Sequence, residues 1–382
     1  MSTIRHLKIL ISTGDVSGDI HASRVIKAVR ALDPSVGFFG LGGPRMREEG
    51  FRALYDSSEL AVVGLTEVAE KFTSIARAYR VLRRSFDTEK PSLVVLVDFP
   101  DFNLLLAGAA KKRGIPVLYY ISPQVWAWRR GRIRKISKRV DRMAVILPFE
   151  APLYEKEGLR TEYVGHPLLE GASVLDMRKF FDLTGLDEGK RIVALLPGSR
   201  SKEVERIAPV LMGAAGILGK AFPDIAFVMP LAPGFSTEAV HPIEGVKVIQ
   251  GMVPEALHAS ALAIVTSGTA TLEAALTGTP MIIVYKLSSL SYWLARSLVA
   301  VKNMGLVNLV AGKRIVPELV QSDAVPERIA EEAQRLLTDE ALCVKMKDEL
   351  KGVVEKLAGP SRHVGASRRV ADIILSMVSL KK

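Results

Sequence analysis

Two aspartates each follow a strongly apolar segment in the first half of the chain. Asp15 stands in the loop STGDVSGDIH, residues 12–21, which comes after the run KILIST at 8–13. Asp98 ends the run SLVVLVD at 92–98. Either Asp98 or Asp101, at the end of the second segment, could act as a general base and take the proton of a hydroxyl nucleophile. We expect Asp98 to have this role, because it follows its apolar segment most directly.

The other acidic and hydroxyl residues of these loops have simpler interpretations. Asp101 is expected to cap the helix that follows Asp98. In the loop 12–21, Asp19 lies where the N-terminus of a helix would favour a negative charge, and Ser17 could cap the same helix. The glycines of this loop suggest a phosphate site, but its two acids argue against one.

A glycine turn in the second half of the chain is a better candidate for a phosphate site. In LLPGSRSKEV, residues 195–204, Gly198, Ser199 and Arg200 join an apolar segment to a helical one. Glycine lets the backbone approach a ligand, the helix N-terminus offers free N–H groups, and Arg200 adds a fixed cation. The alternative is an ordinary strand–helix connection with a surface arginine.

A second turn of this kind is TSGTATLEAAL, residues 266–276. Ser267 and Thr269, on either side of Gly268, could donate hydrogen bonds to phosphate oxygens, and Glu273 could accept from ribose hydroxyls. The alternative is that Thr269 caps the helix and Glu273 interacts with the helix dipole. Neither turn is specific alone, but together they indicate a nucleoside diphosphate.

These residues must be positioned by alternating strands and helices. Most of the apolar runs are apolar throughout, as in parallel strands that are covered on both faces. The expected strands are 8–13, 36–41, 92–98, 116–121, 143–147 and 161–164, and then 191–196, 225–230, 246–250, 261–266 and 280–285. Two such series predict an α/β chain with two facing doubly wound, Rossmann-like domains. Ligands would lie at the carboxyl ends of the strands, in the cleft between the domains.

The join between the domains is expected near VGHPLLE, residues 164–170, where a glycine and a proline interrupt the pattern. The first domain would then cover residues 1–166 and the second 167–359. The C-terminal segment, about 360–382, has apolar residues on one helical face.

Composition excludes several classes of protein. The chain has 382 residues, one cysteine and a net charge of +11. A single cysteine rules out a disulfide framework, and neither a Cys/His cluster nor a D-x-D pair indicates a metal. The longest apolar stretch, 93–110, contains three polar residues, so the protein is expected to be soluble or peripheral. A Walker A motif is absent, and GLGGPR at 40–45 has Arg45 where a dinucleotide motif needs glycine, which disfavours ATP and NAD.

The strongest charge feature is SPQVWAWRRGRIRKISKRVDR, residues 122–142. Eight of its residues from position 129 onward are Lys or Arg, including Arg129 and Arg130, and they follow Trp126 and Trp128. Tryptophans beside a basic helix suit an anionic membrane surface, and they also suit a phosphorylated acceptor. A solvated helix with tryptophans in the core is the alternative. No nucleic acid is expected as a partner, because no RNA- or DNA-binding motif accompanies the segment.

Taken together, the motifs resemble those of the bacterial lipid-A-disaccharide synthase family. They follow the family's order over nearly the whole chain: GDVSGD, GLGGPRM, VVGLTEV, VDFPDFN, YYISPQVWAWR, LPFE, YVGHPLLE, LLPGSRSKEV, TSGTATLEAAL and VNLVAG. The resemblance implies a GT-B fold, in which the C-terminal helix, about 360–382, crosses back onto the first domain. It also implies an inverting, metal-independent glycosyl transfer without a cofactor. The implied substrates are UDP-2,3-diacylglucosamine and 2,3-diacylglucosamine 1-phosphate, and the products are the β-1,6-linked disaccharide 1-phosphate and UDP.

The resemblance also implies roles for the matching residues. Asp98 would be the base, and Asp15 would either orient the acceptor or share the role of base. Residues expected to bind the UDP-sugar donor are Gly198, Ser199, Arg200, Ser267, Gly268, Thr269, Glu273 and Asn308. Residues expected to meet the acceptor or the membrane are Ser17, Trp126, Trp128, Arg129 and Arg130. In one place the chain departs from the family, which usually has Glu at the position of Asp15; the shorter side chain retracts the carboxylate by about 1.5 Å.

Amphiphilic substrates imply a cytoplasmic enzyme that is peripheral on the inner face of the inner membrane, and a homodimer is compatible with the sequence. The alternative within enzymes is another UDP-sugar enzyme of the same fold, such as an epimerase, for which the basic tryptophan segment would have no role. The alternative outside enzymes is a non-catalytic protein that binds a nucleotide or a lipid.

Overall fold

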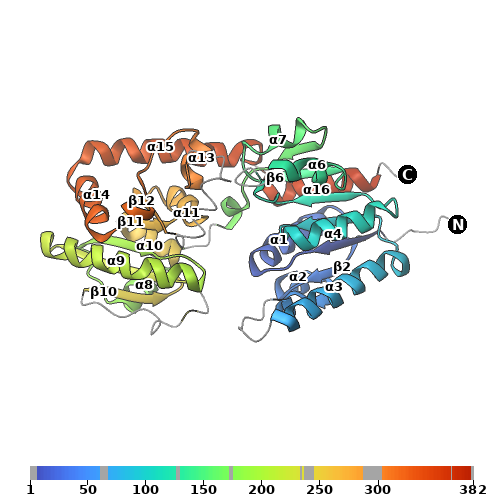
Figure 1. Ribbon diagram of the computed structural model, residues 1–382, viewed down its shortest axis with the longest axis horizontal. Helices are drawn as coiled ribbons and strands as arrows, with labels where there is room; N and C mark the ends of the chain where they lie inside the picture. The colour runs from blue at the N-terminus through green and yellow to red at the C-terminus, as the bar shows by residue number, and fades with distance from the viewer. Residues whose placement is uncertain are drawn as a thin grey trace. The chain divides into compact units, whose positions relative to one another are not determined.

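The computed structural model describes residues 7–60, 68–125, 130–171, 175–232, 235, 245–286, 303–362 and 364–379. The chain divides into two units, residues 1–170 with 357–382, and residues 171–356 (Figure 1). The chain therefore passes from the first unit to the second after residue 170 and returns after residue 356. The expected boundaries lay at 166/167 and 359/360, in the same two connections.

The first unit is built on a parallel sheet with the strand order β3-β2-β1-β4-β5-β6-β7. All six strands expected for this half of the chain form. The seventh strand of the described part, β3, was not expected, because its sequence, RALYD, begins and ends with a charged residue. The strands are β1 (Lys8–Ser12), β2 (Gly37–Gly42), β3 (Arg52–Asp56), β4 (Leu93–Val97), β5 (Val117–Tyr120), β6 (Arg142–Val145) and β7 (Arg160–Tyr163).

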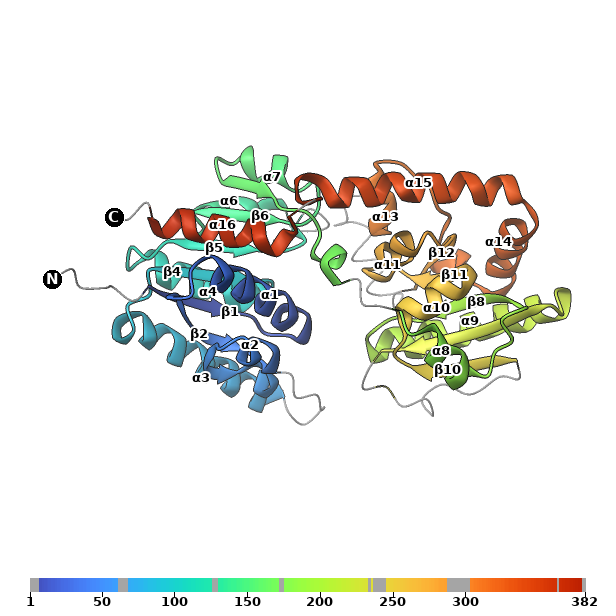
Figure 2. The same cartoon turned by 180° about the vertical axis from the view of Figure 1, so that it is seen from behind.

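Helices cover both faces of this sheet, so its central strands are buried on both sides. On one face, Ile9 and Val95 pack with Val25 of α1 and Val370 of α16. The C-terminal helix α16, red in Figures 1 and 2, therefore packs beside α1 within the first unit. The other face packs mainly against α3 and α4. The helices of this unit are α1 (Val16–Leu32), α2 (Pro44–Glu48), α3 (Val68–Thr88), α4 (Pro100–Lys111), α6 (Ile133–Ser137), α7 (Ala151–Glu155) and α16 (Ala366–Ser379).

The second unit repeats this plan with the order β10-β9-β8-β11-β12-β13. The five expected strands form, and the three-residue edge strand β13 was not expected. The strands are β8 (Arg191–Leu196), β9 (Ile225–Leu231), β10 (Val246–Gln250), β11 (Ser260–Thr266), β12 (Met281–Tyr285) and β13 (Glu318–Val320). The helices are α8 (Met177–Thr184), α9 (Ser201–Ala221), α10 (Val253–Ala259), α11 (Ala270–Thr277), α13 (Leu306–Ala311), α14 (Pro326–Thr338) and α15 (Glu340–Ala358).

Each sheet has a point at which the direction of strand addition reverses, and ligands of such sheets bind there, beyond the carboxyl ends of the strands. In the first sheet this point lies between β1 and β4, and in the second between β8 and β11. The four loops that follow these strands carry Asp15, Asp98, Arg200 and Ser267. The topology therefore places the main candidate residues of each unit at its own switch point.

Both connections between the units are attached to the first unit. The backbone N–H of His166 donates to the carbonyl oxygen of Leu357 at 3.0 Å. The Glu170 carboxylate accepts from the backbone N–H and the hydroxyl of Ser367, at 2.6 and 2.5 Å. Ser367 lies in the first turn of α16, so the outgoing connection also supports the start of the returning helix.

Candidate active site

Asp98 lies in a strained turn between β4 and α4. Its backbone φ is +46°, and that of Phe99 is +48°. Ile121, which follows the neighbouring strand β5, has a φ of +62°. Positive φ costs a non-glycine residue on the order of 1 kcal/mol or more, and such residues concentrate at functional sites. The carboxyl ends of β4 and β5 are therefore the most strained part of the first sheet.

Two buried side chains hold the strained Asp98 backbone. The Asp98 carbonyl oxygen accepts from Asn103 Nδ2 and from the Tyr119 hydroxyl, both at 2.7 Å. Asn103 Oδ1 also accepts from Ser12 Oγ at 2.7 Å, and Nδ2 lies 3.2 Å from the carbonyl oxygens of Ser12 and Val97. Asn103 thus joins the ends of β1 and β4. The sequence reasoning missed both roles, although Asn103 closes the motif VDFPDFN and Tyr119 opens YYISPQ.

The structure brings Asp15 and Asp98 into the same neighbourhood. Burial raises the pKa of the half-buried Asp98 carboxyl to about 6, and the charge of Asp15 contributes in the same direction. The two loops also touch, since a Cβ at Gly14 would lie 2.5 Å from the Phe99 ring. A carboxyl group with a pKa of about 6 is still ionised at neutral pH and is a stronger base than an ordinary aspartate.

Asp15 has a structural role that the sequence did not indicate. It is the N-cap of α1, and its Oδ1 accepts from the backbone N–H of Gly18 at 2.7 Å. Aspartate is among the preferred N-cap residues and glutamate is not. The aspartate at this position therefore gives the chain a helix cap, and its side chain is exposed.

Ser17 and Asp101 do not cap the helices that they were expected to cap. The expected position of Asp19 at the N-terminus of α1 is correct but describes only part of its role. Asp15 takes the cap position of α1, and the Ser17 hydroxyl lies 3.4 Å from His21 Nε2. Asp101 pairs with Arg132 at 3.0 Å, and α4 has no side-chain cap.

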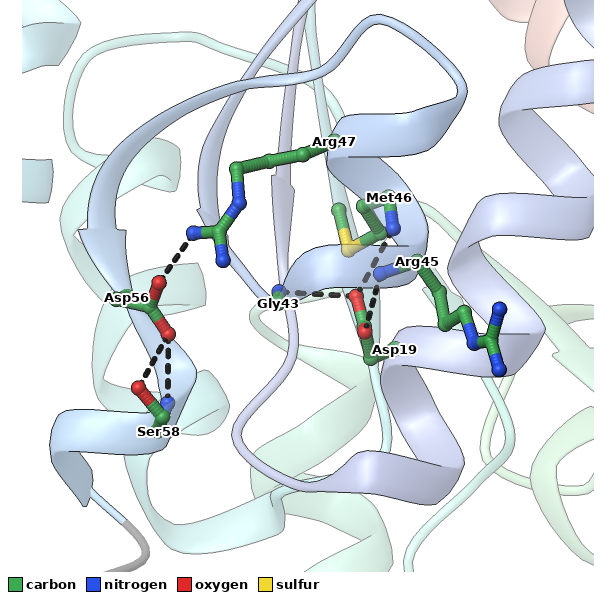
Figure 3. Close-up of polar contacts among 7 residues, drawn as sticks. All are labelled: Asp19, Gly43, Arg45, Met46, Arg47, Asp56 and Ser58. Carbon is green, nitrogen blue, oxygen red and sulfur yellow. Dashed lines mark hydrogen bonds and ion pairs between the residues drawn. The ribbon is translucent and has the colours of Figure 1, made fainter.

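Asp19 lies in the first turn of α1 but bonds to a different helix. Its carboxylate accepts from the backbone N–H groups of Gly43, Arg45 and Met46 at 2.9, 2.9 and 3.2 Å (Figure 3). These groups open α2, so Asp19 joins α1 to α2. This role depends on a contact between segments that are far apart in the sequence.

The first glycine turn of the second unit has the expected backbone conformation, but the Glu203 carboxylate lies against it, which was not expected. Gly198 has a φ of +119°, which side chains rarely allow, and Arg200 precedes α9 with a guanidinium that is 80% exposed. Glu203 Oε2 accepts from the backbone N–H of Ser199 at 3.3 Å, and Oε1 accepts from Arg200 Nη1 at 2.8 Å. The groups expected to hold a diphosphate therefore already contact a carboxylate.

The second glycine turn offers a free carboxylate. Gly268 has a φ of +144°, and the exposed Thr269 begins α11 without a side-chain cap bond. Ser267 donates its hydroxyl proton to the carbonyl oxygen of Met304 at 2.7 Å, so only its oxygen lone pairs remain for a ligand. Burial raises the pKa of Glu273. Its carboxylate has no hydrogen-bond partner among the described residues, which leaves it available to hydroxyl donors.

Asn308 does not present its amide to a ligand. Nδ2 donates to the carbonyl oxygen of Val316 at 3.0 Å and to Glu318 Oε1 at 2.7 Å. Oδ1 accepts from the backbone N–H groups of Ile315 and Val316 at 2.8 and 3.1 Å. Glu318 in turn accepts from the backbone N–H groups of Met304 and Gly305 at the start of α13. Asn308 is fully buried and organises this loop, which contacts Ser267 through Met304.

The described part of the basic tryptophan segment contains a short helical stretch over residues 130–137. Trp126, Trp128 and Arg129 lie outside the described residues, and Arg130 opens a short 3₁₀ turn, Arg130–Arg132, before the five-residue α6. Arg142 belongs to β6, where it is buried and paired with Glu162. The predicted basic helix is therefore shorter than the segment, and Arg142 lies outside it.

The described ranges lack both a metal-binding cluster and a membrane-spanning helix. They contain no group of three or more His, Cys, Asp or Glu side chains that could hold a metal ion. None of the helices in these ranges is long and apolar enough to cross a membrane.

Solved structures share the fold of the chain at low sequence identity. UDP-GlcNAc 2-epimerase from Neisseria meningitidis bound to UDP-GlcNAc superposes with a TM-score of 0.68 at 15% identity, covering 97% of this chain and 100% of that one. The calicheamicin glycosyltransferase superposes with a TM-score of 0.61 at 14% identity, covering 98% and 99%. The chain has the GT-B fold that these glycosyltransferases and epimerases share.

The sequence of the chain also identifies its family. The family model for lipid-A-disaccharide synthetase matches residues 9–367. The lipid-A-disaccharide synthase of Trichlorobacter lovleyi is 45% identical over 99% of both chains, and that of Geobacter metallireducens is 44% identical over 100% of both. With these matches over its whole length, and with the family's motifs at the switch points of both sheets, the chain belongs to the lipid-A-disaccharide synthase family.

Proposed function

We propose that the chain transfers the diacylglucosaminyl group of UDP-2,3-diacylglucosamine to the 6-hydroxyl of 2,3-diacylglucosamine 1-phosphate, with inversion. The products are the β-1,6-linked disaccharide 1-phosphate and UDP. The observation that carries the proposal is the half-buried Asp98 carboxylate, with its pKa raised to about 6, at the switch point of a chain that belongs to this family. The proposal assigns the acceptor to the first unit and the donor to the second.

Asp98 is the general base of the proposed reaction. Its carboxylate takes the proton of the acceptor's 6-hydroxyl as the oxygen forms a bond to the anomeric carbon of the donor. The bond from that carbon to the diphosphate breaks on the opposite side, and UDP leaves with the electron pair. The bonds from Asn103 and Tyr119 to the Asp98 carbonyl oxygen support a fixed position for this base. Asp15 either orients the acceptor or shares the base role, and Ser17 lies in the same loop.

The second unit stabilises the leaving group in this proposal. Arg200 and the backbone of Gly198 and Ser199 bind the diphosphate, where negative charge develops. The turn with Ser267, Gly268 and Thr269 contacts the rest of the nucleotide. Glu273 accepts hydrogen bonds from the ribose hydroxyls, and this role is supported by its carboxylate, which has no hydrogen-bond partner among the described residues. Asn308 acts indirectly, through the loop that contacts Ser267.

Turnover with both lipids tests the proposed reaction. The purified chain is mixed with UDP-2,3-diacylglucosamine and 2,3-diacylglucosamine 1-phosphate in detergent micelles, and UDP and disaccharide phosphate are measured together. Equal amounts of both products are expected, and Asp98→Asn serves as the control for the chemical step. Absence of UDP release with verified lipids would overturn the proposal. Conversion of a UDP-sugar without any acceptor would instead favour an epimerase of the same fold.

We further propose that the enzyme works on the inner face of the inner membrane, because both of its lipid substrates are amphiphiles. Trp126, Trp128, Arg129 and Arg130 are the residues proposed to meet the anionic surface. Sedimentation with vesicles of anionic phospholipid should decrease as ionic strength rises. Binding that does not change with salt would contradict an electrostatic attachment and would indicate apolar insertion.

A further inference from the structure

The Glu203 carboxylate accepts hydrogen bonds from the same groups that, in the proposed function, bind the donor diphosphate. It lies in the first turn of α9, where free N–H groups favour a negative charge. One carboxylate oxygen is 3.3 Å from the Ser199 nitrogen, and the other is 2.8 Å from Arg200 Nη1. The carboxylate also lies over Gly198, where a Cβ would be 2.8 Å from Glu203 Oε2.

Carboxylate and phosphate are both anions that accept hydrogen bonds from the same donors. A diphosphate oxygen that accepts from the Ser199 N–H must displace the Glu203 carboxylate from it, and although Arg200 keeps further N–H donors besides the one bonded to Glu203, the two anions repel at such distances. We propose that Glu203 is an internal competitor of the donor, which neutralises the diphosphate site when it is empty and is displaced when UDP or the UDP-sugar binds. This inference rests on the proposed donor site.

The contacts of Glu203 also limit the strength of the competition. The Arg200 side chain is 80% exposed and that of Glu203 is 26% exposed, so their ion pair is weakened by water. Exposed ion pairs of this kind change affinities by at most about fivefold. The competitor is therefore weak enough to be displaced and strong enough to speed the release of UDP, since it reoccupies the site as the product leaves.

The test compares Glu203→Gln with Glu205→Gln by calorimetric titration with UDP. Both variants remove one negative charge from α9, but Glu205 is exposed and makes no contact with the glycine turn. UDP should bind about two- to fivefold more tightly to Glu203→Gln than to Glu205→Gln. The difference should shrink at high ionic strength, because salt screens exposed charges. Product inhibition by UDP should become stronger in Glu203→Gln by the same factor.

Equal affinity of the two variants, or weaker binding by Glu203→Gln, would overturn the proposal; weaker binding would mean that Glu203 positions Arg200 for the ligand. The double variant Arg200→Ala/Glu203→Gln should gain less UDP affinity over Arg200→Ala than Glu203→Gln gains over the unmodified chain, because without Arg200 the competitor keeps only its contact with Ser199 and its charge. Arg200→Ala alone tests the donor site itself. If it leaves UDP affinity unchanged, the proposed donor site fails, whereas failure of Glu203→Gln alone removes only the competitor.

Discussion

The turn after β4 in the first unit and the turn after β8 in the second both place charged side chains at the end of a parallel strand. In the first turn, the strained Asp98 backbone is bonded to two buried side chains, and burial raises the pKa of its carboxyl to about 6. In the second, glycine removes the strain, and the exposed Arg200 pairs with Glu203 three residues away. A base benefits from partial burial because burial raises its basicity. A cation that must bind and release a charged group benefits from exposure.

This comparison predicts that changes at the first turn alter the chemical step and that changes at the second alter donor affinity. The largest effect is expected for Asp98→Asn. Asparagine keeps the size of the side chain and tolerates positive φ, so kcat should fall about 100-fold or more through loss of the base. UDP affinity should stay the same. Unchanged turnover would remove Asp98 as the base.

Asp98→Asn, which should lower kcat, should also make the folded protein more stable at alkaline pH. The pKa of Asp98 in the folded protein, about 6, lies above its ordinary value of 3.8, so ionisation of this carboxyl destabilises the fold. Thermal denaturation of Asp98→Asn at pH 8 should therefore give a higher Tm than that of the unmodified chain. The advantage should shrink as the pH falls from 6 and disappear below about 4. A lower Tm at pH 8 would contradict the cost of burying this charge.

The next largest effect is expected for Arg200→Ala. A hydrogen bond to a charged group contributes about 1.5–3 kcal/mol, so UDP should bind at least about tenfold more weakly. Arg206→Ala is the matched control, since Arg206 is an exposed cation further along α9. Calorimetric titration with UDP measures both. Equal losses in the two variants would mean that only the general positive charge matters.

A smaller effect is expected for Tyr119→Phe, which removes one of the two bonds to the Asp98 carbonyl oxygen. The loss of one hydrogen bond, about 1 kcal/mol, should lower kcat about fivefold without a change in UDP affinity. Tyr154→Phe is the control, because Tyr154 is equally buried and its hydroxyl contacts Pro123. If both variants lose stability and neither loses kcat, Tyr119 has no positioning role.

The smallest effect is expected for Asp15→Asn, which retains a good N-cap residue and so should leave stability nearly unchanged. The charge of Asp15 raises the pKa of Asp98. Its removal should move the acid limb of the pH profile of kcat/KM to lower pH. A limb that stays in place would contradict the coupling. A loss of kcat as large as that of Asp98→Asn would show that Asp15 shares the role of base.

The fold was predictable in its main parts because its signals are local. Continuous apolar runs identified every strand that is covered on both faces, and the glycine turns marked the connections to α9 and α11. The edge strands β7 and β10 were predicted as well, whereas the edge strands β3 and β13 were missed, because their segments RALYD and ELV offer little continuous apolar sequence. The positions of Asp98 and Arg200 followed from the order of the strands.

The partners of the site residues were less predictable. Asn308 was assigned to the donor site, yet its amide is used by residues of the loop that follows it. The ion pair between Arg200 and Glu203 spans one helical turn and was within reach of sequence reasoning. The bond from Tyr119 to Asp98 was not, because it depends on the pairing of β4 with β5 and on their register. Asn103 lies only five residues after Asp98, but its bonds to Ser12 depend on the pairing of β1 with β4.

By itself, the sequence determined the two α/β series, the strand ends that carry the candidate residues and, through its motifs, the family. Strand and helix periodicity and the backbone freedom of glycine act over a few residues, so they can be read along the chain. Only the tertiary structure decided three features: the raised pKa of Asp98, the hydrogen bonds from α2 to Asp19, and the hydrogen bonds that use the Asn308 amide. Burial and hydrogen bonding depend on which distant residues surround a group, and that is settled only when the sheet and its helices have packed.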